Sequence, residues 1–376
     1  MTEMNKIAFT CIVKNEESNI VKCLDSIKNF CDYFVVVDTG STDNTVKVVN
    51  DFFKENDLAG KVVKEKWQNF AYNRTFALDV ARKDFDAQYI LMLDADETLN
   101  FDQDFDADNF KKSLHVDVYD LKTDLAVVYY RPLLIHRDLK CFYKSILHEY
   151  LEVPDEFTRE KANGLWITSD LSGFRSSQGD DKFKKDAQAL EEALKVEKEP
   201  FLISRYTFYL GQSYRDSGNL IRAIKNYRKR TTQGFWEEEI YESYFAIAEA
   251  FKDLNEKPEI VMASYLQAFE TCPHRAESLH ALSLYCRLKD WFNLSYMYAK
   301  AAINIPLPED GLFVQKWVYD YAIKDELSIS AYWTGRYKES LDLCNELLDE
   351  KLFPEDQLER IVANKKFSLD KINESK

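Results

Sequence analysis

The sequence predicts an α/β domain with a mainly parallel sheet, followed by an all-α domain. In the first half, apolar runs of strand length alternate with helical patterns, a rhythm typical of parallel sheets covered by helices. In the second half the pattern is helical throughout. The chain has only 10 glycines among 376 residues, which favours long helices over turn-rich β architecture. This length suffices for two domains that each have a hydrophobic core.

The first two strands are predicted at residues 7–13 and 33–37, which are largely apolar. Such runs fit strands that are buried on both faces of a sheet. A helical pattern follows each strand, with apolar residues at Ile20, Leu24 and Ile27 after the first and at Val46, Val49 and Phe53 after the second. Ser41 is the predicted N-cap of the second helix, because a serine oxygen can accept a hydrogen bond from the first helical turn.

The following elements lead to an acidic motif. A short third strand is predicted at residues 62–63, and a helix over residues 72–82. The apolar run at residues 89–93 is the predicted strand that ends at Asp94. Residues 100–120 are acidic and uneven, and we expect them to form a solvated loop with a helix.

The predicted first domain ends after two further elements. Residues 127–130 and 133–136 are expected to form a strand pair around Arg131 and Pro132. Glycine and serine then gather at residues 172–179, a composition typical of a linker. The predicted domains are therefore residues 1–181 and 182–376.

Four helical segments of the second domain share small and aromatic residues at a period close to the roughly 34 residues of tetratricopeptide repeats. These residues are Leu210, Gly211, Tyr214, Gly218, Ala223 and Tyr227; Ala248, Phe251, Ala263, Tyr265, Ala268 and Pro273; Leu282, Tyr285, Tyr298, Ala299, Ala302 and Pro306; and Ala331, Tyr332, Gly335, Leu341, Cys344 and Leu347. Small residues let paired helices approach, and aromatic residues fill the gaps between them. The second domain thus resembles a tetratricopeptide-like repeat array.

Composition excludes several classes of function. The 50 lysines and arginines against 65 aspartates and glutamates give a net charge of −15, which disfavours binding to nucleic acid or to anionic membranes. No run approaches the roughly 20 apolar residues of a membrane span. The seven cysteines are an odd number without a C-x-x-C pair, which indicates free thiols in a reducing compartment and hence a cytoplasmic location.

The most informative motif is Asp94-Ala95-Asp96, which follows a predicted buried strand. Open α/β sheets bind ligands at the carboxyl ends of their strands. Two carboxylates on alternate residues can face the same way, so that one binds a divalent ion and the other reaches it through water or holds a ribose hydroxyl. Mn²⁺ and Mg²⁺ suit such a site. Acidic loops without a ligand are also common after strands.

Two earlier segments strengthen this interpretation. Residues 11–18 read CIVKNEES and residues 36–45 read VVDTGSTDNT, each at the end of a predicted strand. Together with the acidic motif, they resemble the family 2 glycosyltransferases of the GT-A fold, a Rossmann-like α/β fold. The resemblance covers residues 5–100. It implies an N-terminal GT-A domain that transfers a sugar from a nucleotide-sugar donor, with inversion and with UDP as the nucleotide.

The resemblance also implies roles for individual residues. Val13, Asn15 and Glu16 would line the uridine pocket, and Asp38 would meet the base or ribose; a turn and helix cap is the alternative for Asp38. Trp67, Phe70, Asn73 and Arg74 match a segment that precedes the acidic motif in related enzymes, so Asn73 and Arg74 would contact nucleotide or phosphate. A surface ion pair is the alternative for Arg74. Asp94, Ala95 and Asp96 would hold the diphosphate and its metal ion.

A second resemblance covers nearly the whole chain and is to bacterial and phage glycosyltransferases that carry tetratricopeptide-like helices. It rests on His148-Glu149-Tyr150-Leu151, Gly173-Phe174-Arg175-Ser176, Lys182-Phe183 with Asp186, residues 208–216 and residues 305–308. Many relatives have a histidine shortly before the glycine at position 173, whereas this chain has Asp170, Leu171 and Ser172 there. This departure leaves the third metal ligand open.

We expect His148 to join Asp94 and Asp96 as a metal ligand, because a neutral imidazole suits Mn²⁺. Glu149 is a candidate general base for the acceptor hydroxyl; the alternative is a solvated acid or a partner of His148. Asp96 would act in catalysis through the metal ion. Arg175, Ser176 and Lys182 would close on the diphosphate as a lid, or else form an ordinary polar linker.

The sequence thus predicts a metal-dependent, inverting glycosyltransferase with a UDP-sugar donor. The acceptor would be a glycan, a protein or another hydroxyl compound, and a second copy of the chain is a candidate partner of the repeats. One alternative is a protein-interaction scaffold with a degenerate nucleotide-binding domain. Another is a nucleotidyltransferase or phosphotransferase that uses the same acidic edge. No P-loop and no G-x-G-x-x-G motif occurs, which counts against kinases and Rossmann dehydrogenases.

Overall fold

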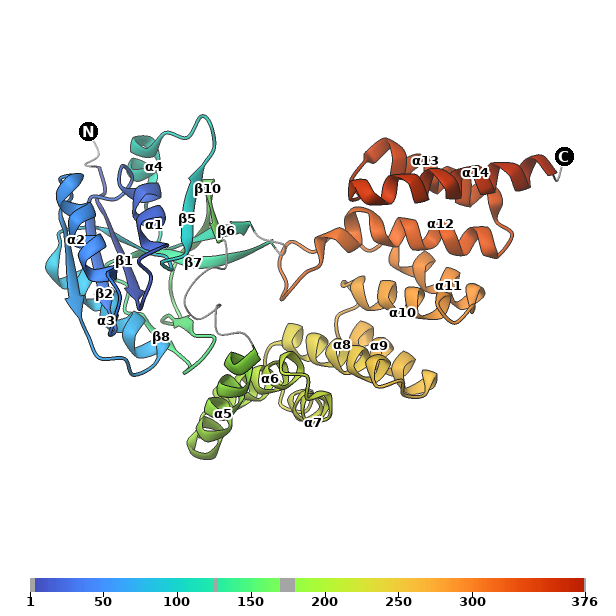
Figure 1. The fold of residues 1–376 in the computed structure, drawn as a ribbon, viewed down its shortest axis with the longest axis horizontal. Helices are drawn as coiled ribbons and strands as arrows, with labels where there is room; N and C mark the ends of the chain where they lie inside the picture. The colour runs from blue at the N-terminus through green and yellow to red at the C-terminus, as the bar shows by residue number, and fades with distance from the viewer. Residues whose placement is uncertain (1–3, 125–127, 170–179, 375–376) are drawn as a thin grey trace. The chain divides into compact units, whose positions relative to one another are not determined.

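The computed structural model describes residues 4–124, 128–169 and 180–374, and it divides into two compact units, Met1–Glu197 and Lys198–Lys376. The first unit is α/β and the second is helical, so the predicted order of fold classes is confirmed (Figure 1). The division places helix α5 (Asp180–Val196) in the first unit, whereas the sequence-based boundary after residue 181 places it in the second.

The described part of the first unit contains an eight-stranded sheet with the strand order β3-β2-β1-β4-β7-β6-β10-β5. Its strands are β1 (Ile7–Val13), β2 (Tyr33–Asp38), β3 (Gly60–Lys64), β4 (Tyr89–Met92), β5 (Glu97–Phe101), β6 (Val118–Asp124), β7 (Val128–His136) and β10 (Arg159–Ser169). The pairs among β3, β2, β1 and β4 are parallel, which confirms the predicted βαβ half. In the other half β7 is antiparallel to β4 and β6, while β10 is parallel to β6 and antiparallel to β5.

Helices cover both faces of the parallel half. The helices of this unit before α5 are α1 (Ile20–Ile27), α2 (Thr45–Glu55), α3 (Phe70–Asp84) and α4 (Ala107–Ser113). Alternate residues of β1, such as Phe9 and Cys11, pack with α1 and α2, whereas Ala8 belongs to a second core with α3. Because both faces of β1, β2 and β4 are buried, these three strands are largely apolar.

The parallel strands bring their carboxyl ends to one edge of the sheet. Val13 at the end of β1 pairs with Asp38 at the end of β2, and Thr10 pairs with Met92 at the end of β4. The three segments that follow these strands therefore lie next to one another. These are the segments that the sequence singled out for donor binding.

Three sequence-based expectations were wrong. Residues 128–136 form one strand rather than a strand pair, and Pro132 is tolerated because it faces the register shift between Tyr119 and Asp120. Residues 100–120 include the end of β5 and the start of β6 besides the expected helix α4. Ser41 does not cap α2, which begins at Thr45; instead, the Ser41 hydroxyl accepts a hydrogen bond from the Asn15 backbone N–H.

The described part of the second unit consists of paired helices (Figure 1). They are α6 (Pro200–Asp216), α7 (Leu220–Arg230), α8 (Glu237–Asp253), α9 (Pro258–Thr271), α10 (Glu277–Arg287), α11 (Phe292–Ala302), α12 (Ile323–Trp333), α13 (Tyr337–Glu350) and α14 (Leu358–Glu374). A π-helical turn at Val318–Ala322 precedes α12. The four predicted segments coincide with the pairs α6–α7, α8–α9, α10–α11 and α12–α13, whose members pack together.

The same backbone turn recurs inside each pair. Gly218, Asn255, Asp290 and Gly335 follow α6, α8, α10 and α12, and all four have a positive φ between 53° and 78°. Glycine, asparagine and aspartate are the residues that adopt this left-handed conformation most readily. The repeat is therefore encoded in its turns as well as in its helices.

Replacement of Gly211 by alanine is expected to destabilise the second unit by at least about 1 kcal/mol. A Cβ atom at this position in α6 would lie 2.9 Å from the Tyr227 ring of α7, and the overpacking cost of about 1–3 kcal/mol outweighs the better helix propensity of alanine. Urea unfolding followed by tryptophan fluorescence measures the change, with the exposed Lys225→Ala as the control. An unchanged midpoint for Gly211→Ala would show that the helices do not depend on this close contact.

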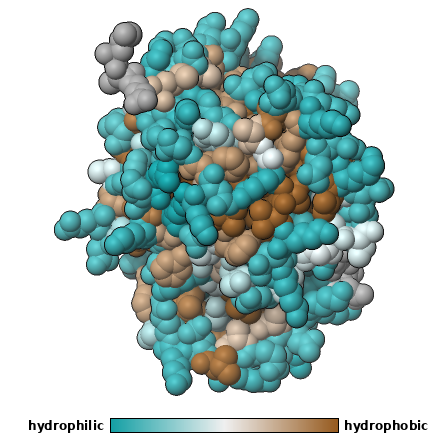
Figure 2. Space-filling model, turned by 90° about the vertical axis from the view of Figure 1, so that its left-hand side faces the viewer, coloured by the Kyte–Doolittle hydropathy of each residue, from teal (hydrophilic) through white to brown (hydrophobic). Residues whose placement is uncertain are grey.

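The face shown in Figure 2 is mostly hydrophilic, with hydrophobic residues gathered near its middle. Within the described residues, each helix is either too short or too polar to span a lipid bilayer.

Candidate active site

A cavity of about 660 Å³ lies at the carboxyl edge of the parallel strands, within the first unit. The segments after β1, β2 and β4 contribute to it, together with residues 147–149 and one face of α5. Nine of the predicted site residues line this cavity: Val13, Glu16, Arg74, Asp94, Ala95, Asp96, His148, Glu149 and Lys182. Two others, Arg175 and Ser176, lie outside the described residues.

Arg74 joins two of the predicted acidic residues. Its Nη2 lies 2.5 Å from Asp94 Oδ1, and its Nε lies 2.6 Å from Glu149 Oε1. The Arg74 side chain is only 12% exposed, so this pairing takes place largely out of solvent. Burial raises the pKa of Asp94, but the guanidinium groups of Arg74 and Arg131 lower it by more, and the pKa falls below its usual value. Asp94 is therefore ionised and holds Arg74 in place.

A second arginine, Arg131, contacts Glu97, the residue that directly follows the acidic motif. Glu97 Oε2 accepts a hydrogen bond of 2.8 Å from the Asp94 backbone N–H, and its other oxygen pairs with Arg131 of β7. Burial raises the pKa of Glu97, and the nearby Asp94 raises it further, against the opposing charge of Arg131. The sequence does not indicate a role for Arg131, because Arg131 and Glu97 belong to strands that are far apart in the chain.

Two of the predicted metal ligands, Asp96 and His148, reach the cavity from different segments. In the described part of the chain, the ligand atoms of Asp94, Asp96 and His148 do not all gather within 4.8 Å of one another. Asp96 and His148 both line the cavity, and Asp96 is half-buried whereas His148 is exposed. His148 has a φ of 52° and Ser145 a φ of 81°, so the chain makes a tight left-handed turn between β8 (Phe142–Lys144) and β9 (Tyr150–Glu152). This turn brings His148 to the cavity from a segment distant in sequence.

Three predicted binding residues contact loops rather than the cavity lining. Asp38 Oδ1 accepts a hydrogen bond of 3.0 Å from the Ser41 N–H, and Asn15 Oδ1 accepts one of 2.7 Å from the Thr42 N–H. Asn73 is fully buried, and its amide bonds the backbone at Gln68 and Lys66. These contacts shape the two loops that flank the cavity, and Asn73 fixes the segment that carries Trp67.

Helix α5 presents one face to the cavity. Lys182, Lys185, Asp186 and Ala189 all line it, at the spacing i, i+3, i+4 and i+7 that places residues on one side of a helix. Lys185 was not among the predicted site residues, although this spacing relative to Lys182 could have revealed it. Lys14, which directly follows β1, also lines the cavity. The cavity lining therefore includes three lysines, Lys14, Lys182 and Lys185, although the protein as a whole is acidic.

Comparison with known proteins identifies the N-terminal segment. Residues 11–105 match the family model described as Glycosyl transferase family 2. An uncharacterized glycosyltransferase of Rickettsia typhi is 35% identical over 97 residues, which cover 26% of this chain and 30% of the relative. The SPbeta prophage-derived glycosyltransferase SunS of Bacillus subtilis is 36% identical over 90 residues, which cover 23% of this chain and 19% of SunS. The chain spans less than a third of the length of these relatives.

Among solved structures, Staphylococcus aureus TarS (residues 1–349, in complex with UDP-GlcNAc) matches with 15% identity and a TM-score of 0.34, covering 71% of this chain and 89% of that one. The family match confirms the predicted family 2 glycosyltransferase domain for residues 11–105, a segment that includes the acidic motif.

Proposed function

We propose that this protein transfers a sugar from a nucleotide-sugar, with UDP as the preferred nucleotide, to an acceptor hydroxyl group, and that it inverts the anomeric carbon. The observation that carries the proposal is the placement of Asp96. Asp96 lies within the segment that matches Glycosyl transferase family 2, and its carboxylate follows β4 and lines the cavity. Open α/β sheets bind nucleotides at this edge.

The donor set of the cavity fits a divalent cation. An Asp96 carboxylate and a His148 imidazole provide oxygen and nitrogen ligands, a combination that suits Mn²⁺ better than Mg²⁺. Asp94 is engaged by Arg74 through Oδ1, so we assign it an indirect role, through a metal-bound water or a ribose hydroxyl. A cation bound there would neutralise charge on the leaving diphosphate.

The chain's own cations complete the diphosphate site. Lys182 and Lys185 project from one face of α5, and Lys14 follows β1. Charge-assisted hydrogen bonds from these ammonium groups would hold the phosphate oxygens and stabilise the negative charge that builds up as the bond to the sugar breaks. Trp67 and Phe70 pack edge to face, with their ring centroids 4.8 Å apart. We expect them to form an apolar wall for the base or the sugar.

Two carboxylates of the cavity are candidates for the general base. Glu149, the predicted base, is bonded to Arg74 and would position that arginine. Asp186 of α5 lines the same cavity. We propose that one of these two carboxylates removes the acceptor proton.

Replacement of the residue that acts as the base by its amide, either Glu149→Gln or Asp186→Asn, is expected to lower kcat at least about a hundredfold, the usual contribution of a general base, with little change in KM for the donor. Steady-state transfer assays on Asp186→Asn and Glu149→Gln decide between the two residues. If Glu149→Gln loses kcat alone while Asp186→Asn retains it, Glu149 is the base.

The donor is best identified by hydrolysis, because slow hydrolysis of the sugar donor needs no acceptor. A panel of UDP-, GDP- and dTDP-sugars is incubated with the full chain and Mn²⁺, and release of nucleoside diphosphate is measured. We expect one or a few UDP-sugars to be hydrolysed. Absence of hydrolysis and of nucleotide binding across the panel would favour the rival function, a protein-interaction scaffold built on the repeats.

The acceptor would be a glycan, a protein or another hydroxyl compound, held by the helical repeats, which could also bind a second copy of the chain. We place the protein in the cytoplasm, because all seven of its cysteines are buried free thiols in the described residues.

A further inference from the structure

A second group of metal-binding side chains lies in the helical unit, where α8 begins and where α9 turns into α10. One ligand atom each from Glu238, Cys272 and His274 lie within 4.8 Å of one another. Cys272 is fully buried, whereas the His274 side chain is 58% exposed. The three residues provide sulfur, nitrogen and oxygen donors from two separate segments, a combination typical of zinc sites in proteins.

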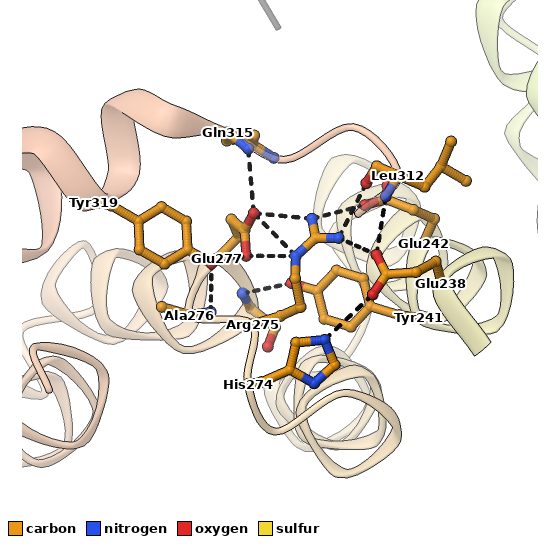
Figure 3. A network of polar contacts seen from close by, with 11 residues as sticks. Glu238, Tyr241, Glu242, His274, Arg275, Ala276, Glu277, Leu312, Gln315 and Tyr319 are labelled. Atoms are coloured by element: carbon orange, nitrogen blue, oxygen red, sulfur yellow. Dashed lines mark hydrogen bonds and ion pairs between the residues drawn. The ribbon is translucent and has the colours of Figure 1, made fainter. Parts of the chain in front are cut away.

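The Glu238 carboxylate is held in a fixed orientation. Its Oε2 accepts hydrogen bonds from Arg275 Nη1 at 2.5 Å and from the Leu312 N–H at 3.0 Å. Its Oε1 faces the other way, 3.4 Å from His274 Nε2, and Figure 3 shows the carboxylate between the arginine and the imidazole. Outer contacts of this kind orient ligands toward a metal ion.

Several carboxylates gather beside this group of side chains. The fully buried Arg275 contacts three carboxylates, those of Glu238, Glu242 and Glu277. An added cation would balance these carboxylates and would displace the thiol proton.

We propose that Glu238, Cys272 and His274 bind a zinc ion that links the start of α8 to the turn before α10. Zinc in a tetrahedral site needs ligand atoms about 3.3–3.8 Å apart, and a small movement of the exposed His274 side chain closes the remaining gap. The fourth position belongs to water on the exposed side. Binding forms a Zn–S bond and breaks the S–H bond of Cys272, and the proton leaves to solvent. The site is independent of the proposed sugar transfer.

Cobalt(II) is the probe, because a cobalt–thiolate bond gives a charge-transfer absorption that carboxylate and imidazole ligands do not. The full chain is stripped with a chelator and titrated with Co²⁺ and then with Zn²⁺. We expect the thiolate band to appear with Co²⁺ and to disappear as Zn²⁺ displaces it. In Asp96→Asn, which lacks a ligand of the cation site proposed in the other unit, about one proton should be released per ion bound. Asp96→Asn should retain the band, because Asp96 belongs to the other unit.

Substitutions of Cys272 and His274 test whether these side chains bind the ion. Cys272→Ser should abolish the band, and His274→Gln should weaken Zn²⁺ binding at least about tenfold, while the exposed His115→Gln should bind as the parent does. Circular dichroism checks that Cys272→Ser is folded. If Cys272→Ser is unfolded, the Zn²⁺ affinity of His274→Gln decides, because His274 is exposed and its replacement should leave the fold intact. The proposal is overturned if no thiolate band forms, if the band survives in folded Cys272→Ser, or if His274→Gln binds zinc as tightly as the parent.

Discussion

Asp96→Asn is expected to reduce turnover of the sugar donor at least about a thousandfold. A metal ion that neutralises the leaving diphosphate contributes several kcal/mol to the transition state, and each 1.36 kcal/mol corresponds to a factor of ten in rate. Asparagine keeps the size of the side chain but lacks the charge that binds the cation. Because Asp96 is half-buried at the rim of the cavity, the fold should survive.

Donor hydrolysis in the presence of Mn²⁺ measures this effect, and circular dichroism checks the fold. Asp108→Asn is the matched control, because it removes an exposed aspartate of α4 outside the cavity lining. Parental turnover in Asp96→Asn would remove Asp96 from the mechanism. Equal losses in both variants would point to a general effect of surface charge.

Arg275→Met is expected to destabilise the helical unit by about 3–5 kcal/mol, the cost of removing one partner from a buried ion pair. Arg275 is fully buried, and its loss leaves the carboxylates of Glu238, Glu242 and Glu277 without their shared cation. The arginine also bonds the Leu312 carbonyl, and so connects α8 and α10 to the segment before α12.

Urea unfolding followed by tryptophan fluorescence suits this test, because four of the six tryptophans, Trp236, Trp291, Trp317 and Trp333, belong to the helical unit. Arg228→Met is the control, since Arg228 is exposed. Its guanidinium carbon lies 5.3 Å from the centroid of the Phe251 ring, a contact that contributes about 0.5–1 kcal/mol to stability. Equal midpoints for the two variants would mean that the carboxylates around Arg275 are satisfied without it.

The sequence predicted the features that depend on local pattern. The apolar runs of β1 and β2 are readable because both faces of these strands are buried, and the turn residues Gly218 and Gly335 mark two of the helix pairs. The carboxyl edge of the parallel strands could also be predicted, because parallel strands bring the ends of distant segments together. This edge was predicted for Asp96 from the strand that precedes it, whereas the role of Glu16 came from the family resemblance.

The sequence could not predict contacts between distant segments. Arg131 meets Glu97 only because β7 lies next to β4 in the sheet, and no local pattern in β7 indicates that position. The pairing of Arg74 with both Asp94 and Glu149 depends in the same way on the turn that carries Glu149. The strand β5 was missed because its partner β10 is far along the chain.

Calorimetric titration of the full chain with UDP, with and without Mn²⁺, tests the central claim most directly. We predict that UDP binds the parent protein tightly only when Mn²⁺ is present, and that Asp96→Asn shows weak binding that Mn²⁺ does not improve. If UDP bound equally well to both proteins, or failed to bind either of them in the presence of Mn²⁺, the cavity beside β4 would not be a metal-dependent nucleotide site.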